Sequence, residues 1–562
     1  MSQSWSKALA RFSARVTFLN AAFLLSAAGI AAVGGISHQA AAVEGNGTFV
    51  RAINSNPPNI FPYTSNDGET VILYGYLYER LGQRNRDTYA WEPNVASKWE
   101  TSADGKEFSF TIDPKAKFSN GSKITAEDVK FSFDVIYFDG VQSAAHKPDY
   151  EQIKNVEVLA PDKVKFTVKD VFYKNFDSIA ELIILPKAHY MELYKKDKTL
   201  SKSEVTRNVL GSNAYTIERW DDNQQIVLKR NPNYWNKEKR IAKNTWNQEK
   251  VIFKIIPDDA VEIEALKKGD LSFLALGPKQ WAKDTTGDEF KTKITKVQAN
   301  SKQAFSFSYI GWNLKHPILG DKNVRWALSH LVNLSLWSKK FDFDLHEPTV
   351  GPFSVKSDEH DKSVLPVPYD PKLASKRLAA AGWTKAGKDG FLVKDGKKLE
   401  FTIMYPTQSK ATAEPKLTEF KNSAAKVGVS VLLKAVEWTG FLKLMDDRNF
   451  DAVTLAWSRD LDPDLKQIWH SASIADKGSN FISYSNPEVD KLIDQQRASL
   501  DRSKRIELSQ KIEKLIVEDQ PYTFLSEAKF KLYAHQNTVT KEKDSFNYEI
   551  GFDSWKIAVP LK

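Results

Sequence analysis

The sequence predicts a mixed α/β fold, and three observations support this class. The chain has 562 residues, 27% charged and 41% hydrophobic, which is a globular composition with enough length for two or three lobes. Several short segments alternate polar and apolar residues. Between them lie segments with helix start and stop signals, and no repeat of fixed period separates the chain into units.

Strands are predicted where apolar and polar residues alternate with a period of two, as on a half-buried sheet. Four segments show this pattern: EFSFTI (107–112), KVKFTV (163–168), QQIVLKR (224–230) and VIFKII (251–256).

Helices are predicted where a capping residue precedes a helical pattern. Thr125 is a predicted N-cap, followed by Glu127 and Asp128 in the first turn. Residues 370–382, DPKLASKRLAAAG, combine an Asp cap, a proline in the first turn and a final glycine. Residues 502–518 place charged and apolar positions at helical spacing.

The first 42 residues have the pattern of an export signal. Three basic residues, with no acidic residue nearby, precede a mostly apolar run at 16–33. Ala40 and Ala42 then form an A-x-A site, which predicts a mature start at Val43. The alternative is an uncleaved membrane anchor, since the run approaches spanning length. The polar residues inside the run and the cleavage site after it favour the cleaved signal.

Composition excludes several kinds of site and partner. The chain has no cysteine, which excludes disulfides, zinc–thiolate sites, a cysteine nucleophile and a lipid-modified N-terminal cysteine. The formal charge is +9, but the basic residues are dispersed, so no nucleic-acid partner is predicted. With export, these features predict a freely soluble protein beyond the inner membrane.

Signatures of common enzymes are missing. The sequence has neither a G-x-S-x-G elbow nor an H-E-x-x-H motif. Residues 382–389, GWTKAGKD, follow phosphate-loop spacing, but Asp389 stands where a hydroxyl residue would hold magnesium. A helix also precedes this stretch where a strand is needed, so we interpret it as a helix-ending turn.

Three aspartates, Asp460, Asp462 and Asp464, stand between two tryptophans in WSRDLDPDLKQIWHS (457–471). Their spacing fits the first three ligands of a calcium loop. Leu465 stands where that loop needs glycine, and Ser471 where it needs a bidentate Glu. We therefore predict no metal here.

Residues 91–134 resemble a signature stretch of the extracellular solute-binding proteins of peptide ABC transporters, family 5. The family pattern is Pro-x-Leu-Ala-x-x-Trp, Asp-Gly, an aromatic strand, Phe-Ser-Asp-Gly and Thr-Ala-x-Asp-Val. The matching positions are Pro93, Val95, Ala96, Trp99, Asp104, Gly105, Phe108, Phe118, Asn120, Gly121, Thr125, Ala126, Asp128 and Val129, with Asn120 in place of the usual Asp. Further segments follow in the family's order, at 211–235, 311–333, 369–383, 427–438, 450–457 and 478–493.

The resemblance implies two α/β lobes with an inserted extra domain and a ligand cleft that closes by hinge motion. After the signal peptide at 1–42, it implies the following division: lobe I from 43–90, 206–310 and 526–562, an inserted domain II at 91–205, and lobe II (domain III) at 311–525.

The resemblance also suggests ligand-binding residues. In oligopeptide-binding relatives, a Trp-x-x-Asp at this place puts a carboxylate on the ligand's free α-amino group, and Trp457 and Asp460 match it. An enclosed carboxylate is well satisfied by an ammonium at contact distance. The other expected ligand-binding residues are aromatic surfaces at Trp438 and Tyr484 and polar contacts from Ser479 and Asn480. We expect Asp462 and Asp464 to be solvent-exposed turn residues.

The function that follows is a periplasmic receptor, not an enzyme and without a cofactor. It would capture peptides as a monomer and deliver them to an ABC permease and its ATPase. One alternative keeps the fold and changes the ligand to a sugar, a nickel complex or a microcin-like compound. A second is an exported hydrolase that uses Asp460 and Glu437 as paired carboxylates. A third is a structural envelope protein that does not close.

Overall fold

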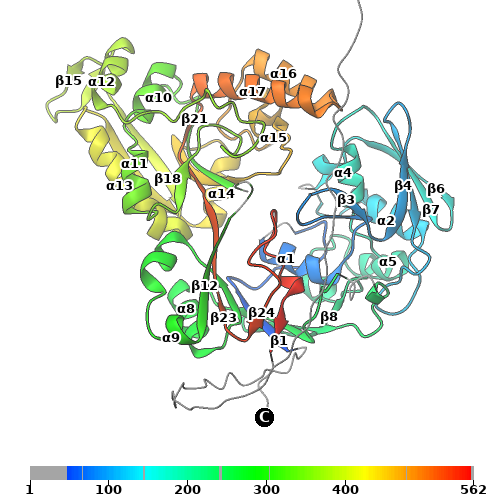
Figure 1. Ribbon diagram of the computed structural model, residues 1–562. Coiled ribbons are helices and arrows are strands. Elements are labelled where there is room, and N and C mark those ends of the chain that lie inside the picture. Colours follow the sequence, from blue (N-terminus) through cyan, green and yellow to red (C-terminus); the bar gives the residue numbers. More distant parts are fainter. Residues whose placement is uncertain are drawn as a thin grey trace, which may run out of the picture. The chain divides into compact units, whose positions relative to one another are not determined.

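The computed structural model describes residues 47–65, 68–143, 146–238, 243–300, 302, 304, 306–475 and 478–558 (Figure 1). The predicted export signal lies outside these residues. The mixed α/β class is confirmed. The four predicted strands are present as β5 (Glu107–Ile112), β7 (Lys163–Val168), β9 (Gln225–Arg230) and β10 (Lys250–Ile255).

The predicted helices are also present, and their caps explain where they begin. In α2 (Ala126–Asp134), Thr125 and Asp128 form a reciprocal capping box, which satisfies backbone donors at the helix start. Asp370 caps α12 (Pro371–Ala380) through the Leu373 amide. Asp501 caps α17 (Arg502–Asp519), which is preceded by α16 (Pro487–Ala498).

The largest sheet has seven strands drawn from distant parts of the chain. Its order is β12 (Ile294–Asn300), β23 (Phe530–Gln536), β11 (Phe273–Ala275), β1 (Thr48–Ile53), β10, β9 and β8 (Tyr215–Asp221). β1 runs parallel to β10 and β11, and the other described pairs are antiparallel. The helices α1 (Gly68–Leu77) and α8 (Asp259–Lys268) belong to this part of the chain.

A four-stranded antiparallel sheet lies between β1 and β8 in sequence. Its order is β4 (Ala96–Thr101), β5, β7 and β6 (Ile153–Ala160). It is accompanied by α2, α4 (Asn175–Ala180) and α5 (Lys187–Lys196). Buried residues of this sheet and of the seven-stranded sheet, such as Phe110 and Phe49, belong to one continuous apolar core.

A five-stranded mixed sheet has apolar cores of its own. Its order is β19 (Ser430–Val436), β18 (Glu400–Pro406), β20 (Ala452–Ser458), β13 (Ser306–Trp312) and β21 (Tyr522–Phe524). Side chains of β13 pack into two clusters: Trp312 lies with Phe401 in one, and Tyr309 lies with Tyr522 in the other. The surrounding helices are α10 (Lys322–Ser329), α12, α13 (Lys410–Ala425), α14 (Trp438–Asp446), α16 and α17.

The chain passes twice between the seven-stranded and the five-stranded sheet. One passage joins β12 to β13, and the other joins β21, through β22 (Ser526–Ala528), to β23. The remaining strands form small sheets: β2 (Gly82–Arg84) with β3 (Trp91–Pro93), β14 (His346–Pro348) with β22, β15 (Lys385–Ala386) with β16 (Leu392–Lys394) and β17 (Lys397–Lys398), and β24 (Val539–Thr540) with β25 (Lys556–Ile557). The assignment of segments to domains at the expected boundaries stays a prediction.

Candidate ligand-binding site

A cavity of about 840 Å³ is the candidate site, and its lining comes from two parts of the fold. One side is built from residues between Pro62 and Ile183, together with Tyr548, in the part that contains the seven-stranded and four-stranded sheets with their continuous core. The other side is built around the five-stranded sheet, from 356–359, 460–462 and α17. Opposite surfaces that enclose one space are the usual setting for a ligand.

The lining is polar, with balanced charge and many tyrosines. Its basic residues are Arg80, Arg84, Lys174, Lys302, Lys356, Arg502 and Arg505. Its acidic residues are Asp149, Asp177, Glu181, Asp358, Glu359, Asp460 and Asp462. The tyrosines are Tyr63, Tyr74, Tyr89, Tyr150, Tyr173 and Tyr548. Such a lining suits a ligand that carries both polar groups and hydrophobic surface.

Asp460 lines this cavity, as expected, and forms an ion pair with a lysine of the protein. It lies two residues after the end of β20. Its Oδ2 accepts from Nζ of Lys174 at 2.6 Å. Lys174 comes from the opposite side, where it directly precedes α4. The ammonium beside Asp460 is thus an intramolecular one.

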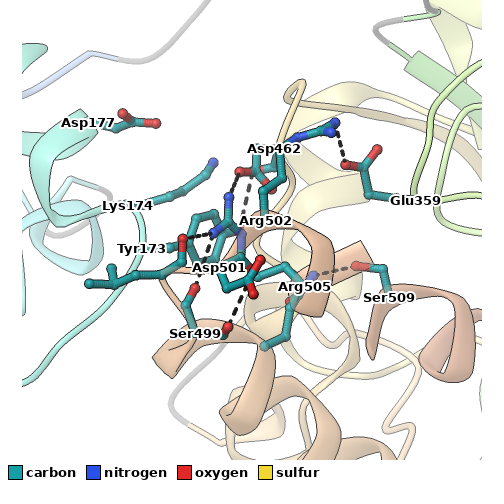
Figure 2. A network of polar contacts seen from close by, with 12 residues as sticks. Tyr173, Lys174, Asp177, Glu359, Asp462, Ser499, Asp501, Arg502, Arg505 and Ser509 are labelled. Carbon is teal, nitrogen blue, oxygen red and sulfur yellow. Dashed lines mark hydrogen bonds and ion pairs between the residues drawn. The ribbon is translucent and has the colours of Figure 1, made fainter. Parts of the chain in front are cut away.

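The neighbours of Lys174 also contact the opposite side, and we call this set the 172–174 contact. The Tyr173 hydroxyl donates to the carbonyl oxygen of Asp462 at 3.2 Å, and the Tyr173 amide donates to the carbonyl oxygen of Arg497 at 3.1 Å. Arg505 lies over the Tyr173 ring at 4.4 Å, and Arg497 lies over the Phe172 ring at 4.3 Å. Figure 2 shows Tyr173 and Lys174 beside Asp462, Arg502 and Arg505.

Asp462 and Asp464 are not the solvent-exposed turn residues that we expected. Both are half-buried. Asp462 forms an ion pair with Arg505 at 2.7 Å, and Asp464 forms one with Arg497 at 3.3 Å. The expectation was wrong because these arginines, on α16 and α17, lie far along the chain. The aspartates attach the 460–464 loop to the helices that support the cavity.

Three carboxyl groups of the lining, Asp149, Glu181 and Glu359, have raised pKa values, and burial is the main cause for each. Burial, with the nearby charges of Glu181 and Asp460, raises the pKa of Asp149 to about 6. Burial also raises the pKa of Glu181, although Arg80 opposes the shift. The cavity therefore disfavours the charged form of all three groups.

Trp457 and Trp438, the two tryptophans predicted to bind ligand, lie outside the lining of this cavity. Trp457 is half-buried, stacks on Phe481 and donates from Nε1 to the Tyr522 hydroxyl at 3.1 Å. Trp438 is 41% exposed and stacks on Phe441. Both tryptophans are therefore stacked within the part of the chain that contains the five-stranded sheet.

The predicted polar contacts and Tyr484 also lie outside the lining. Ser479 is half-buried, whereas Asn480 and Tyr484 are buried. The Asn480 amide donates to the carbonyl oxygens of His470 and Tyr484, and its Oδ1 accepts from the Tyr484 amide. The Tyr484 hydroxyl donates to Asp519 at 2.9 Å. Asn480 and Tyr484 thus hold the loop before α16, and the ligand-binding roles of these residues stay predictions.

No sequence pattern indicates the opposite side of the cavity. Tyr173, Lys174, Asp149 and Glu181 follow no motif that we singled out. Lys174 directly precedes α4, whose six residues NFDSIA mix polar and apolar side chains and have no side-chain cap, so this segment has no clear local signal. Glu437, proposed from the sequence as the second acid of a hydrolase pair, is not part of the described lining.

None of the helices in the described part of the chain is long and apolar enough to cross a membrane.

Comparison with known proteins identifies relatives along most of the chain. The chain is 31% identical to the oligopeptide-binding protein AppA of Bacillus subtilis (strain 168) over 479 residues, 82% of each chain. The solved structure of that protein in complex with a nonapeptide matches with a TM-score of 0.78 and 26% identity, covering 91% of this chain and 99% of the other. NikZ of Campylobacter jejuni, solved with Ni(L-His), matches with a TM-score of 0.75 and 22% identity over 91% and 99% of the two chains.

The family expected from the sequence is confirmed, and so is the two-lobed α/β fold of periplasmic binding proteins. Residues 90–479 match the family described as bacterial extracellular solute-binding proteins, family 5 Middle. This match spans more than half of the chain, so the protein belongs to the family 5 bacterial extracellular solute-binding proteins.

Proposed function

We propose that the protein is the substrate-binding component of an ABC importer, and that it captures peptides in the cavity around Lys174 and Asp460. The observation that carries the proposal is a cavity of about 840 Å³ lined from two sides of the fold. That volume lies within the roughly 300–1,000 Å³ usual for small-molecule sites, so a short peptide is the appropriate size of ligand.

The connections between the two sides support capture by closure. The passages from β12 to β13 and from β22 to β23 are the covalent links between the seven-stranded and five-stranded sheets. A few residues at such links can absorb the backbone rotation of a hinge. The ligand enters while the two sides are apart and is enclosed when the 172–174 contact forms.

The relatives support a peptide as the ligand. AppA of Bacillus subtilis is named an oligopeptide-binding protein and was solved with a nonapeptide. A peptide backbone offers hydrogen-bonding groups at every residue, and the tyrosines and charged groups of the cavity can bind these and the side chains.

The predicted export signal supports a periplasmic location. There the protein would act as a monomer, without catalysis, and pass its cargo to a membrane permease driven by ATPase subunits. Residues 1–42 would be removed during export, leaving Val43 as the first residue.

Identification of the bound molecule tests the proposal. The chain is expressed with export to the periplasm of a host, purified without denaturation and then unfolded, and the released molecules are identified by mass spectrometry. We expect short peptides, and retention of an added tetrapeptide library by protein freed of that cargo. Release of a sugar or a nickel chelate, without retention of the library, would contradict peptide binding and leave the transport role.

A further inference from the structure

The ion pair between Lys174 and Asp460 joins the two sides of the cavity. The Lys174 side chain is 17% exposed, and that of Asp460 is 70% exposed. Their Nζ and Oδ2 atoms are 2.6 Å apart, which is a short, direct ionic hydrogen bond. A lysine ammonium and a peptide's terminal ammonium present the same charge and the same N–H donors to a carboxylate.

Lys174 is held at Asp460 by its neighbours in the chain. The Tyr173 amide and hydroxyl bond to backbone oxygens of Arg497 and Asp462. Lys174 then directly precedes α4, so the fixed backbone on either side limits where its side chain can reach. When the 172–174 contact forms, the ammonium is brought to Asp460 with it.

Other charges keep Lys174 protonated in this enclosed position. Burial lowers its pKa, but Asp460, followed by Asp464 and Asp177, outweighs the effect, so the pKa lies above its ordinary value. A ligand ammonium that took the place of Lys174 on Asp460 would leave this second cation enclosed without its closest partner. An unpaired ammonium is unfavourable at Lys174 because its side chain is only 17% exposed, whereas Asp460 is open to water.

We propose that Lys174 is a specificity-determining residue that supplies the ammonium for Asp460, so that the protein closes on peptides whose amino terminus is blocked or modified as readily as on free ones. This inference rests on the proposed function. It assigns Asp460 to closure of the cavity, in place of the ligand-amine role expected from the family resemblance.

The test compares two matched ligand pools. An equimolar tetrapeptide library, and the same library after N-acetylation, are mixed with the purified chain, and the retained peptides are quantified by mass spectrometry after rapid gel filtration. For the unmodified protein we expect a ratio of free to acetylated peptide below threefold. For Lys174→Met, Asp460 loses its ammonium, and we expect the ratio to rise at least fivefold.

Three variants control for folding and charge. Lys174→Arg keeps a cation and should keep the low ratio. Lys187→Met removes a lysine whose ion pair with Glu127 is exposed and outside the cavity, so it should leave the ratio unchanged. Adding Asp460→Asn to Lys174→Met should abolish the gain, because the acceptor is then neutral.

The outcomes separate the inference from the function on which it rests. A ratio of threefold or more for the unmodified protein overturns the inference and leaves peptide capture intact, and so does a rise of less than fivefold for Lys174→Met. Retention of neither library overturns peptide capture, and the inference with it. The measurement on the unmodified protein stands even if Lys174→Met does not fold.

Discussion

The guanidinium of Arg459 and the carboxylate of Glu527 form an ion pair of 2.5 Å, with side chains only 3% and 0% exposed. Arg459 also donates to the carbonyl oxygens of Pro352 and Phe353 and to the Thr349 hydroxyl. Because Arg459 directly precedes Asp460, this buried network fixes one side of the cavity. Each of the two charges neutralises the other. Removing either side chain therefore leaves the other one as an unpaired buried charge.

Arg459→Met should therefore destabilise the protein strongly. Breaking a buried pair from one side commonly costs about 3–5 kcal/mol, because the remaining charge is uncompensated. We expect a loss of this size in the free energy of unfolding measured with urea. In a double variant with Glu527→Gln, part of the loss should be recovered. A loss below about 1 kcal/mol for Arg459→Met alone would contradict a structural role for the pair.

The helices and strands that were predicted could be predicted because their signals are local. Thr125 and Asp128 are three positions apart, and together they start α2 as a capping box. The alternation in 107–112 likewise needs no distant partner to predict β5, whose residues alternate between half-buried and buried. Where the residues that indicate an element lie within one helical turn or one strand, the local sequence is sufficient to predict that element.

The candidate site is less predictable because its contacts join distant residues. Lys174 and Asp460 are 286 positions apart, and no pattern around either residue indicates the other. Asp460 itself was found only through a family resemblance. Asn480 is expected to contact ligand for the same reason, and its side chain also forms hydrogen bonds to Tyr484 of its own loop. A resemblance locates a loop, but the contacts of each side chain depend on the tertiary structure.

Glu262 should make the protein less stable as the pH rises. This carboxyl, in the first turn of α8, is 8% exposed, and burial, with the charges of Asp259, Glu69 and Asp258, raises its pKa from 4.5 to about 7. Between these values the folded state binds more protons than the unfolded state, so stability falls with rising pH and the loss is complete above about 7. The shift corresponds to at most about 3 kcal/mol.

Glu262→Gln should remove that loss. Urea unfolding at about pH 5 and about pH 8 would measure it, and the Gln variant should gain stability relative to the unmodified protein as the pH rises. Glu264→Gln is the matched control, because Glu264 is exposed on the same helix and its pKa is lowered by Lys267. If the stability of Glu262→Gln and of the unmodified protein depends on pH in the same way, the pKa of Glu262 is not raised in the folded protein.

Tyr173→Ala should shift the protein toward a state with the two sides apart. The change removes a cation–π contact with Arg505, worth about 1–2 kcal/mol, and a hydroxyl hydrogen bond, worth about 1 kcal/mol. We expect a larger radius of gyration by small-angle X-ray scattering, reversed by excess tetrapeptide library. Tyr173→Phe should have a smaller effect, and Tyr137→Ala, at an exposed tyrosine, should have none. An unchanged radius for Tyr173→Ala would argue against the 172–174 contact as the closure.

Asn480→Ala should lower stability without weakening peptide retention by the folded fraction. The Asn480 side chain is fully buried and bonds the carbonyl oxygens of His470 and Tyr484 and the Tyr484 amide. Each buried group left unsatisfied costs about 1–3 kcal/mol, so we expect a loss of about 2–4 kcal/mol in urea unfolding. Asn422→Ala, at an exposed position of α13, should change stability by no more than about 0.5 kcal/mol. A fall of tenfold or more in retention of the tetrapeptide library by the folded fraction would show instead that Asn480 contacts the ligand.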